Sequence, residues 1–597
     1  MTKKNEKINA ELYSSIPLAQ TIVLFCQAKN IQHIIISPGS RNAPLTKGFT
    51  NNSFFKTYSI VDERAAAFFA LGIAQQTKKA VAVVCTSGSA LLNYYPAVAE
   101  AFYSDIPLVV LSADRMPHRI DIGDGQTIRQ PHVFEPHLED AAYLLPDVSH
   151  ATTALVDHPT QTLLKKGTTK EAVLSRQLEI QQQNEVNINR VLNSAIVASG
   201  PVHLNIPFEE PLYETTKKSI VLSQNTPLSK EVMTQELDGF IDQWNSVKKK
   251  MILVGVLAPN SLDQSIVDYL ASDPSITVLT EATSNLSHHT FIQSIDTFIA
   301  PLEKSGNSLS AYQPELLLTL GGMIVSKKIK NFLRQNPPKA HWHLDEKKAY
   351  DTFYCLTNHI SIAPLNFFEA LKQKQPTYVK SDYCTHFLAQ YNKHRLLGVD
   401  YLKKIPFSDL KAFALIFKLL PKDIYLQLAN SSTIRYAQLF KLPPLKGVFC
   451  NRGTSGIDGS TSTAMGAAWV NDAPTVFITG DLSFFYDANG LWNDYLKPTT
   501  RIIVINNSGG GIFRILPGEK DTITYDTYFE TVQQRSAKKL CQLNGIGYLS
   551  ASSSLGLSLQ LKRFFRPSSR PQLLEITTPR TINDTVLLNY FSSMQGE

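Results

Sequence analysis

Short apolar runs alternate with longer segments of helical periodicity along this chain. In the first third, apolar runs at 33–37, 80–86 and 107–112 predict strands, and the segments 64–76 and 91–103 predict helices. An alternation of this kind is typical of parallel α/β units. The pattern therefore predicts a parallel sheet flanked by helices in this part of the chain.

The same pattern recurs in two further parts of the chain. A run at 201–206 leads into a Pro- and Thr-containing stretch near 211–227, where the first part ends, and a polar stretch near 373–380 ends the second. The later strand candidates are 251–256, 276–280, 315–320 and 341–344 in the middle part, and 424–428, 475–479, 501–505 and 572–576 in the last. We therefore expect an α/β protein of three domains, at 1–213, 228–375 and 400–597, each a mostly parallel sheet flanked by helices.

Composition narrows the class of protein. The chain has 597 residues, too many for one core, and its 43% hydrophobic and 18% charged residues fit a globular protein. The net charge of +7 comes from scattered Lys and Arg, so a site for acidic small molecules explains it without nucleic acid. We expect no signal peptide, because no apolar stretch follows the early lysines, and no run reaches the ~20 apolar residues of a membrane span. Six cysteines without a C-x-x-C pair suggest reduced thiols in a cytoplasmic protein.

Two polar segments that follow predicted strands suggest a metal site. They are T-G-D-L-S at 479–483 and I-N-N-S-G-G-G-I-F at 505–513, with a helix expected between them at roughly 485–495. Since ligands bind at the carboxyl ends of parallel strands, Asp481 and Asn507 should lie on one rim of the sheet. Hard oxygen ligands and nearby glycines suit Mg²⁺ held against a diphosphate. The alternative is two ordinary turns, where Gly, Asp and Asn are common.

This pair of segments resembles the G-D-x…N-N motif of thiamine-diphosphate enzymes, although Leu482 stands where a glycine usually follows the aspartate. The resemblance implies thiamine diphosphate as cofactor and Mg²⁺, which Mn²⁺ can replace, bound by Asp481, Asn507 and the carbonyl of Gly509. It also implies a pyrimidine-binding domain at 1–213, a central domain at 228–375 and a diphosphate-binding domain at 400–597. In these enzymes the active sites lie between subunits of a homo-oligomer.

A cofactor of this kind needs a carboxyl group against its aminopyrimidine ring to activate it. Glu63, in V-D-E-R-A-A-A-F-F-A-L-G at 61–72, follows a short apolar run and opens an Ala-rich helix. Taken alone, it could be a carboxylate that stabilises a helix N-terminus. The order of the glutamate in the first domain and the metal motif in the third matches the decarboxylase-like thiamine-diphosphate enzymes.

Further motifs make the resemblance narrower. They are S-P-G-S-R-N-A-P-L (37–45), T-S-G-S-A-L-L-N (86–93), S-A-D-R (112–115), G-Q-T-I-R-Q (125–130), N-R-G-T-S-G-I-D-G (451–459) and N-N-S-G-G-G-I-F (506–513). Together they resemble the family of 2-succinyl-5-enolpyruvyl-6-hydroxy-3-cyclohexene-1-carboxylate synthases of menaquinone biosynthesis. The resemblance implies decarboxylation of 2-oxoglutarate and conjugate addition of the resulting succinyl-semialdehyde unit to isochorismate.

The family resemblance also assigns residues. Its catalytic group, besides Glu63, comprises Ser40, Arg41, Gln126 and Arg435. Its substrate-binding group comprises Arg115, Lys327, Lys328, Ser431 and Arg452, although an arginine is expected at 328, and lysine cannot form the same planar bidentate pair. The residues that it places at the cofactor, besides Glu63, are Ile457, Ser483, Gly509 and Ile512. Two dicarboxylate substrates account for a site rich in cations and hydroxyls.

Other interpretations stay open at the level of sequence. Another thiamine-diphosphate carboligase, such as an acetohydroxyacid synthase, would share Glu63 and Asp481 but use a small 2-oxo acid. A non-catalytic nucleotide-binding protein of the same fold is a second alternative, which the presence of Glu63 and Asp481 opposes. A nicotinamide oxidoreductase lacks support, because no G-x-G-x-x-G follows a first strand. Individually, Arg115 or Arg435 could be surface charges, and Lys327, Lys328 and Lys330 could serve solubility alone.

Overall fold

A computed structural model of the chain describes residues 12–221, 236–304, 309–374, 379–516, 518, 520 and 522–595. By their contacts these residues form two compact units, and each is described by itself. The first unit comprises Met1–Lys230, Thr461–Asn471 and Asp487–Leu496, and the second comprises Glu231–Ser460, Asp472–Tyr486 and Lys497–Glu597. The predicted domain borders at 228 and 375 lie outside the described residues, and the domain division stays a prediction.

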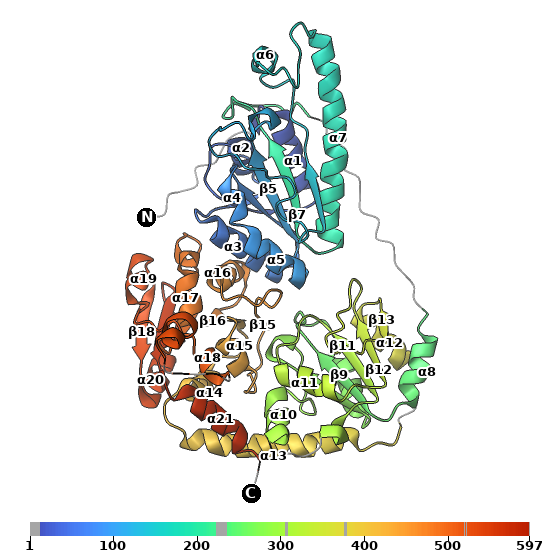
Figure 1. The fold of residues 1–597 in the computed structure, drawn as a ribbon, viewed down its shortest axis with the longest axis vertical. Helices are drawn as coiled ribbons and strands as arrows, with labels where there is room; N and C mark the ends of the chain where they lie inside the picture. The colour runs from blue at the N-terminus through green and yellow to red at the C-terminus, as the bar shows by residue number, and fades with distance from the viewer. Residues whose placement is uncertain are drawn as a thin grey trace. The chain divides into compact units, whose positions relative to one another are not determined.

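The first unit contains a six-stranded parallel sheet with the strand order β3-β2-β4-β5-β7-β6. Its strands are β2 (His33–Ile36), β3 (Lys56–Ser59), β4 (Val81–Cys85), β5 (Leu108–Asp114), β6 (Asp140–Tyr143) and β7 (Val202–Pro207). Its main helices are α1 (Pro17–Ala28), α2 (Ala43–Thr50), α3 (Glu63–Thr77), α4 (Ser89–Leu92), α5 (Tyr95–Ser104) and α7 (Lys170–Val197). Figure 1 shows α7 beside strands β5 and β7. Strands β4, β5 and β7 are buried along their whole length, as expected for a sheet covered on both faces.

Helix α3 is capped by a neighbouring residue and packs against a helix from a distant part of the sequence. The side chain of Asp62 caps it by accepting a hydrogen bond from the Ala65 N–H at 3.1 Å. Further along, Gly72 meets α16 (Ser460–Val470) so closely that a Cβ there would lie 2.1 Å from the Thr463 carbonyl oxygen. Gly466 approaches α3 in the same way, with a Cβ position 2.0 Å from the Phe69 carbonyl oxygen. Two glycines therefore let the backbones of these helices touch.

The second unit contains two sheets. One is five-stranded and parallel, in the order β10-β9-β11-β12-β13, and the other is six-stranded and parallel, in the order β15-β14-β16-β17-β19-β18. The first is built from β9 (Lys250–Val254), β10 (Ile276–Thr280), β11 (Leu316–Leu320), β12 (Ala340–Leu344) and β13 (Asn358–Ile360). The second is built from β14 (Tyr425–Leu428), β15 (Gly447–Phe449), β16 (Thr475–Gly480), β17 (Arg501–Asn506), β18 (Gly547–Ala551) and β19 (Gln572–Thr577). The expected α/β class with three mostly parallel sheets is thus confirmed.

Helices cover these two sheets. Those around the five-stranded sheet are α8 (Asp238–Ser246), α9 (Gln264–Ser272), α10 (Ile295–Lys304), α11 (Lys327–Gln335) and α12 (Pro364–Gln373). Those around the six-stranded sheet include α14 (Asp409–Leu419), α15 (Ser432–Ala437), α17 (Asp481–Tyr486), α18 (Ile512–Ile515), α19 (Lys538–Leu543), α20 (Ser554–Phe564) and α21 (Asn583–Ser592). Helix α13 (Tyr383–Lys404) contacts both α10 and α21, and Figure 1 shows it running past both of them.

Two helix predictions were wrong in detail. The segment 485–495 is not one helix: α17 ends at Tyr486 and a short 3₁₀ turn, η4, covers Ala488–Leu491. Asp487 interrupts the helix because its carboxylate accepts the Ser462 N–H at 2.7 Å, and Gly490 packs directly against Ser462. The segment 91–103 is split into α4 and α5, and α5 restarts at Tyr95 with Pro96 in its first turn, where a missing N–H costs nothing.

Candidate active site

Polar residues that follow β14, β16 and β17 converge at one rim of the six-stranded sheet of the second unit. These three strands are parallel neighbours, so Ser431, Asp481 and Asn507 emerge at the same edge. A cavity of about 180 Å³ opens there. Seven residues singled out from the sequence line it: Ser431, Ile457, Asp481, Ser483, Asn507, Gly509 and Ile512. The structure therefore brings the whole predicted metal and diphosphate set together.

Asp481 is the buried acid of this rim, with 2% of its surface exposed. One carboxylate oxygen accepts the Leu482 N–H at 2.8 Å, and the other accepts Nε2 of Gln533 at 2.6 Å. Burial raises its pKa to about 6, while the hydrogen bonds from Gln533 and Leu482 act in the opposite direction. Sequence reasoning missed Gln533, because it follows no strand and stands in no motif.

The backbone at 508–511 presents a carbonyl beside Asp481. Gly509 has φ +149°, and a Cβ on it would lie 2.6 Å from the carbonyl oxygen of Glu530. The same oxygen accepts the Gly510 N–H at 2.6 Å. The carbonyl oxygen of Gly509 accepts the Gly511 N–H at 3.0 Å, which leaves it one further lone pair. Only glycine fits at 509, because both the backbone conformation and the available space exclude a side chain.

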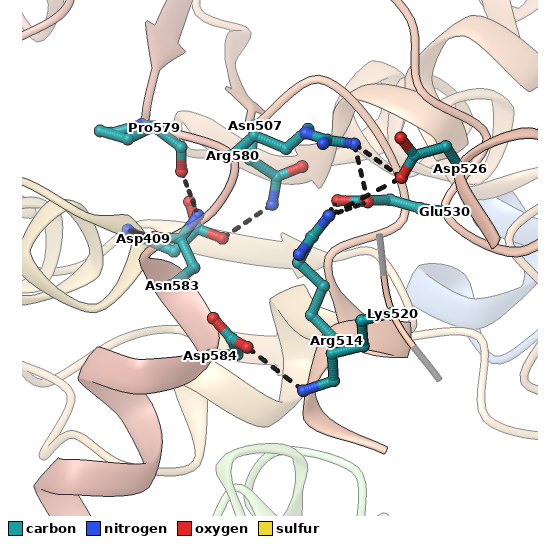
Figure 2. Close-up of polar contacts among 10 residues, drawn as sticks. All are labelled: Asp409, Asn507, Arg514, Lys520, Asp526, Glu530, Pro579, Arg580, Asn583 and Asp584. Atoms are coloured by element: carbon teal, nitrogen blue, oxygen red, sulfur yellow. Dashed lines mark hydrogen bonds and ion pairs between the residues drawn. The ribbon is translucent and has the colours of Figure 1, made fainter. Parts of the chain in front are cut away.

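A buried ion-pair network holds Glu530 behind this loop. Arg514 donates to both carboxylate oxygens of Glu530 at 2.7 Å, and Arg580 donates to one of them at 3.0 Å. Arg580 also donates to Asp526 at 3.1 Å, and Figure 2 shows both arginines directed at these two acids. Because Glu530 is 1% exposed, losing either arginine would leave a poorly compensated buried charge. The network therefore fixes the backbone against which Gly509 and Gly510 rest.

Two predicted arginines lie close together near the same rim. Arg452 donates from Nη1 to Oδ1 of Asn430 at 2.7 Å, and Asn430 in turn donates to the carbonyls of Asn451 and Gly456. Burial lowers the pKa of Arg435, and the nearby Arg452 lowers it further. Among the described residues, the buried Nε atoms of both arginines have no hydrogen-bond partner. Donors that the protein does not use remain available to an anion.

The lysines at the start of α11 differ in exposure and in their partners. Lys327 and Lys328 open α11, where Lys327 is exposed and Lys328 donates to Glu303 at 2.5 Å in a partly exposed ion pair. Lys330 is half-buried, whereas the sequence alone assigned it no role beyond solubility. Burial lowers its pKa, Arg452 and Arg435 act in the same direction, and Glu281 acts in the opposite one. The structure thus adds Lys330 to the arginines near this rim.

The remaining predicted residues lie at the carboxyl edge of the sheet in the first unit. Ser40 and Arg41 follow β2, Glu63 follows β3, and Arg115 follows β5. Arg41 is 4% exposed and donates to the Phe208 carbonyl at 3.1 Å and to Glu210 at 3.2 Å. Burial lowers the pKa of Arg41, and the nearby Arg115 adds to the effect. The buried Nε atoms of Arg41 and Arg115 lack hydrogen-bond partners within the described part of the chain.

Ser40, Gln126 and Glu63 complete this edge. Ser40 is exposed, and Gln126 is exposed with its backbone 3.3 Å from the Cβ position of Gly88. The buried member of the same motif is Gln130, which accepts the Gly88 N–H at 2.9 Å and donates to Asn205 at 2.6 Å. The carboxyl of Glu63 is partly buried, and that burial raises its pKa. A raised pKa makes this carboxyl a better proton acceptor than an ordinary glutamate.

Comparison with a family model defines the class of enzyme. Residues 16–141 match the family model for the N-terminal TPP binding domain of thiamine pyrophosphate enzymes. The sheet rims and their polar residues agree with this class, so the chain is an enzyme of the thiamine pyrophosphate type. Among the described residues, no helix is both long and apolar enough to cross a membrane.

Full-length relatives define the family. A 2-succinyl-5-enolpyruvyl-6-hydroxy-3-cyclohexene-1-carboxylate synthase from Christiangramia forsetii is 50% identical, over 98% of this chain and 100% of the relative. The synthase of the same name from Flavobacterium psychrophilum is 49% identical over the same shares, and that from Porphyromonas gingivalis is 37% identical over 96% of each chain. The chain belongs to the family of 2-succinyl-5-enolpyruvyl-6-hydroxy-3-cyclohexene-1-carboxylate synthases.

Proposed function

We propose that this enzyme decarboxylates 2-oxoglutarate and adds the succinyl-semialdehyde unit to isochorismate, with thiamine diphosphate and Mg²⁺. The proposal depends above all on one observation, the convergence of Asp481, Asn507 and Gly509 at a single cavity of the six-stranded sheet. Family membership and the four partly unused arginines support it.

The residues at the cavity fit a hard divalent cation. Asp481 supplies carboxylate oxygens, Asn507 an amide oxygen, and Gly509 a carbonyl oxygen with a free lone pair. Oxygen donors of these three kinds are the ones that Mg²⁺ prefers beside a diphosphate, and Mn²⁺ accepts the same set. We propose that these three residues hold the metal.

Other residues of the chain would hold the cofactor. Ser483 and Ile512 line the same cavity, and the hydroxyl of Ser483 donates to the Ile457 carbonyl at 2.7 Å, which fixes the backbone of that apolar residue. Thiamine diphosphate, when bound, supplies the electron sink that decarboxylation of a 2-oxo acid requires. Glu63 would hold or release one proton at the cofactor's aminopyrimidine ring, a task that fits its raised pKa.

The cationic residues account for the substrates. 2-Oxoglutarate and isochorismate each carry two carboxylates, and charge-assisted pairs with guanidinium groups bind such ligands well. Arg41, Arg115, Arg435 and Arg452 each keep a buried Nε without a partner among the described residues. We assign these arginines to the substrate carboxylates, assisted by Ser40, Gln126, Ser431, Lys327 and Lys328.

Turnover with single omissions tests the proposal. The purified chain is incubated with 2-oxoglutarate, isochorismate, thiamine diphosphate and Mg²⁺, and each component is left out in turn. We expect product only in the complete mixture. We also expect Mn²⁺ to substitute for Mg²⁺ in that mixture. Faster turnover of pyruvate than of 2-oxoglutarate would instead assign the chain to an acetohydroxyacid synthase-like reaction. We also propose a homo-oligomer, which light scattering of the same sample would show.

A further inference from the structure

Asp409 is a buried acid that none of the motifs includes. It is the first residue of α14, is 2% exposed, and its backbone N–H donates to Oδ1 of Asn583 at 2.8 Å. Asn583 is itself fixed, because its amide donates to the Pro579 carbonyl at 2.8 Å. Figure 2 shows these residues side by side, with Asn507 beside the Asp409 carboxylate. Asn583, the first residue of α21, therefore fixes the backbone position of Asp409.

Both oxygens of the Asp409 carboxylate accept hydrogen bonds from other parts of the sheet rim. Nδ2 of Asn507 lies 2.8 Å from Oδ2, and the hydroxyl of Thr578 lies 2.5 Å from Oδ1. An acid at a helix N-terminus often serves only to cap its own helix. Here Ser408 performs that task by accepting the Lys411 N–H at 3.4 Å, while Asp409 receives donors that follow β17 and β19. The Asp409 carboxylate therefore binds residues at the rim of the sheet and does not cap its own helix.

The consequence concerns which end of the Asn507 amide faces the cavity. An asparagine side chain has a donor end and an acceptor end, and an ionised carboxylate can only accept. Asp409 thus selects the NH₂ end and turns the amide oxygen of Asn507 away from itself. Asn507 lines the same cavity as Asp481 and Gly509. Outer groups that orient a metal ligand in this way commonly change metal affinity by ~10–100-fold when they are removed.

We propose that Asp409 is a positioning residue for the metal site, which holds the amide oxygen of Asn507 toward the cation. This inference rests on the proposed function, because it assumes that Asn507 binds Mg²⁺. Thr578 supports it by donating to Oδ1 of Asp409, so that the carboxylate is held with Oδ2 toward Asn507.

The first test measures metal affinity rather than activity. Mn²⁺ is titrated into the full chain at saturating thiamine diphosphate, and free Mn²⁺ is followed by electron paramagnetic resonance. We expect Asp409→Ala to weaken Mn²⁺ binding by ~10–100-fold. The matched control is Asp487→Ala, since both aspartates are buried, burial raises the pKa of each to about 6, and Asp487 lies in the first unit. Equal effects of the two variants would overturn the proposal.

A second test exchanges donor and acceptor. In Asn507→Asp two carboxylates face each other, so we expect weak Mn²⁺ binding. Adding Asp409→Asn restores one donor and one acceptor with their places reversed, and affinity should recover at least ~tenfold over Asn507→Asp alone. No recovery would refute the positioning role. If the unmodified chain showed no metal-dependent binding of thiamine diphosphate, the proposed function would fail instead. If Asn507→Ala lost Mn²⁺ binding and Asp409→Ala kept it, only this inference would fail.

Discussion

Gln533 donates a hydrogen bond to Asp481, with Nε2 of the amide 2.6 Å from Oδ2 of the carboxylate. Both side chains are buried, at 6% and 2% exposure. The contact leaves the Asp481 carboxylate little freedom to rotate. Gln533 is held in turn, because its backbone N–H donates to the Ser508 carbonyl at 3.1 Å and its side-chain oxygen accepts the Arg535 N–H. A ligand that is fixed before the metal arrives binds it with a smaller loss of entropy.

Replacing Gln533 with methionine should therefore weaken the metal site. We expect Gln533→Met to raise the dissociation constant for Mg²⁺, at saturating thiamine diphosphate, by about tenfold or more. Calorimetric titration measures it. Gln177→Met is the matched control, because Gln177 also donates to a buried aspartate, Asp147, at 2.6 Å in the first unit. Similar metal affinities for the two variants would show that the Gln533 contact is only structural.

Glu63→Gln should block activation of the cofactor while the fold persists. The amide has nearly the shape of the carboxyl but cannot share its proton with the aminopyrimidine ring. We expect hydrogen–deuterium exchange at C2 of bound thiamine diphosphate to slow by at least ~100-fold. Glu100→Gln serves as control, since Glu100 is 1% exposed in the same unit and accepts the Ser104 hydroxyl. An exchange rate equal to that of the unmodified enzyme would remove Glu63 from this role.

Arg41→Ala and Arg435→Ala should each damage substrate selection more than cofactor binding. A carboxylate that loses its guanidinium partner stays desolvated and unpaired, at a cost on the order of 2–5 kcal/mol. We expect kcat/KM for at least one of the two dicarboxylate substrates to fall by ~tenfold or more, where tenfold is about 1.4 kcal/mol. Steady-state kinetics with each substrate varied in turn measures it.

The control for these two variants is Arg176→Ala, which removes one exposed positive charge paired with Glu179. Thiamine-diphosphate affinity should stay near its original value in all three variants, because the two arginines are assigned to substrate. If Arg41→Ala and Arg435→Ala both retained the original kinetics for both substrates, the assignment of cations to carboxylates would be wrong.

His203 should make stability depend on pH. It is fully buried on β7, its Nε2 lies 2.7 Å from the Ser112 hydroxyl, and burial lowers its pKa to about 3. In the unfolded chain the pKa is ~6.5, so below that pH the unfolded state binds a proton that the folded state cannot. Between pH 7 and pH 5 the unmodified protein should lose about 2 kcal/mol of stability relative to His203→Gln. Urea unfolding at both pH values measures this difference, and an unchanged difference would mean that His203 is not neutral when folded.

The local pattern of the chain was sufficient for the strands and for most of the metal set. The run at 276–280 coincides with β10, Ile276–Thr280, which is buried along its whole length and is mostly apolar, as expected for a strand in a sheet covered on both faces. Asp481 and Asn507 were identified because each directly follows such a run, and parallel strands end at one rim. Family resemblance added the arginines, whose types and motifs are visible in the sequence.

Only the tertiary structure decided what holds these residues in place. The partners of Asp481 and Asn507 are Gln533, 52 residues away, and Asp409, 98 residues away. No periodicity or spacing encodes a hydrogen bond between segments so far apart, because it depends on where separate loops end after the sheet has formed. The same holds for the break after Tyr486, where Asp487 turns to Ser462, and for Lys330, which is half-buried near Arg435 and Arg452 while Lys328 pairs with Glu303. The sequence determines which groups are present at the rim, and packing determines which of their atoms are free to bind.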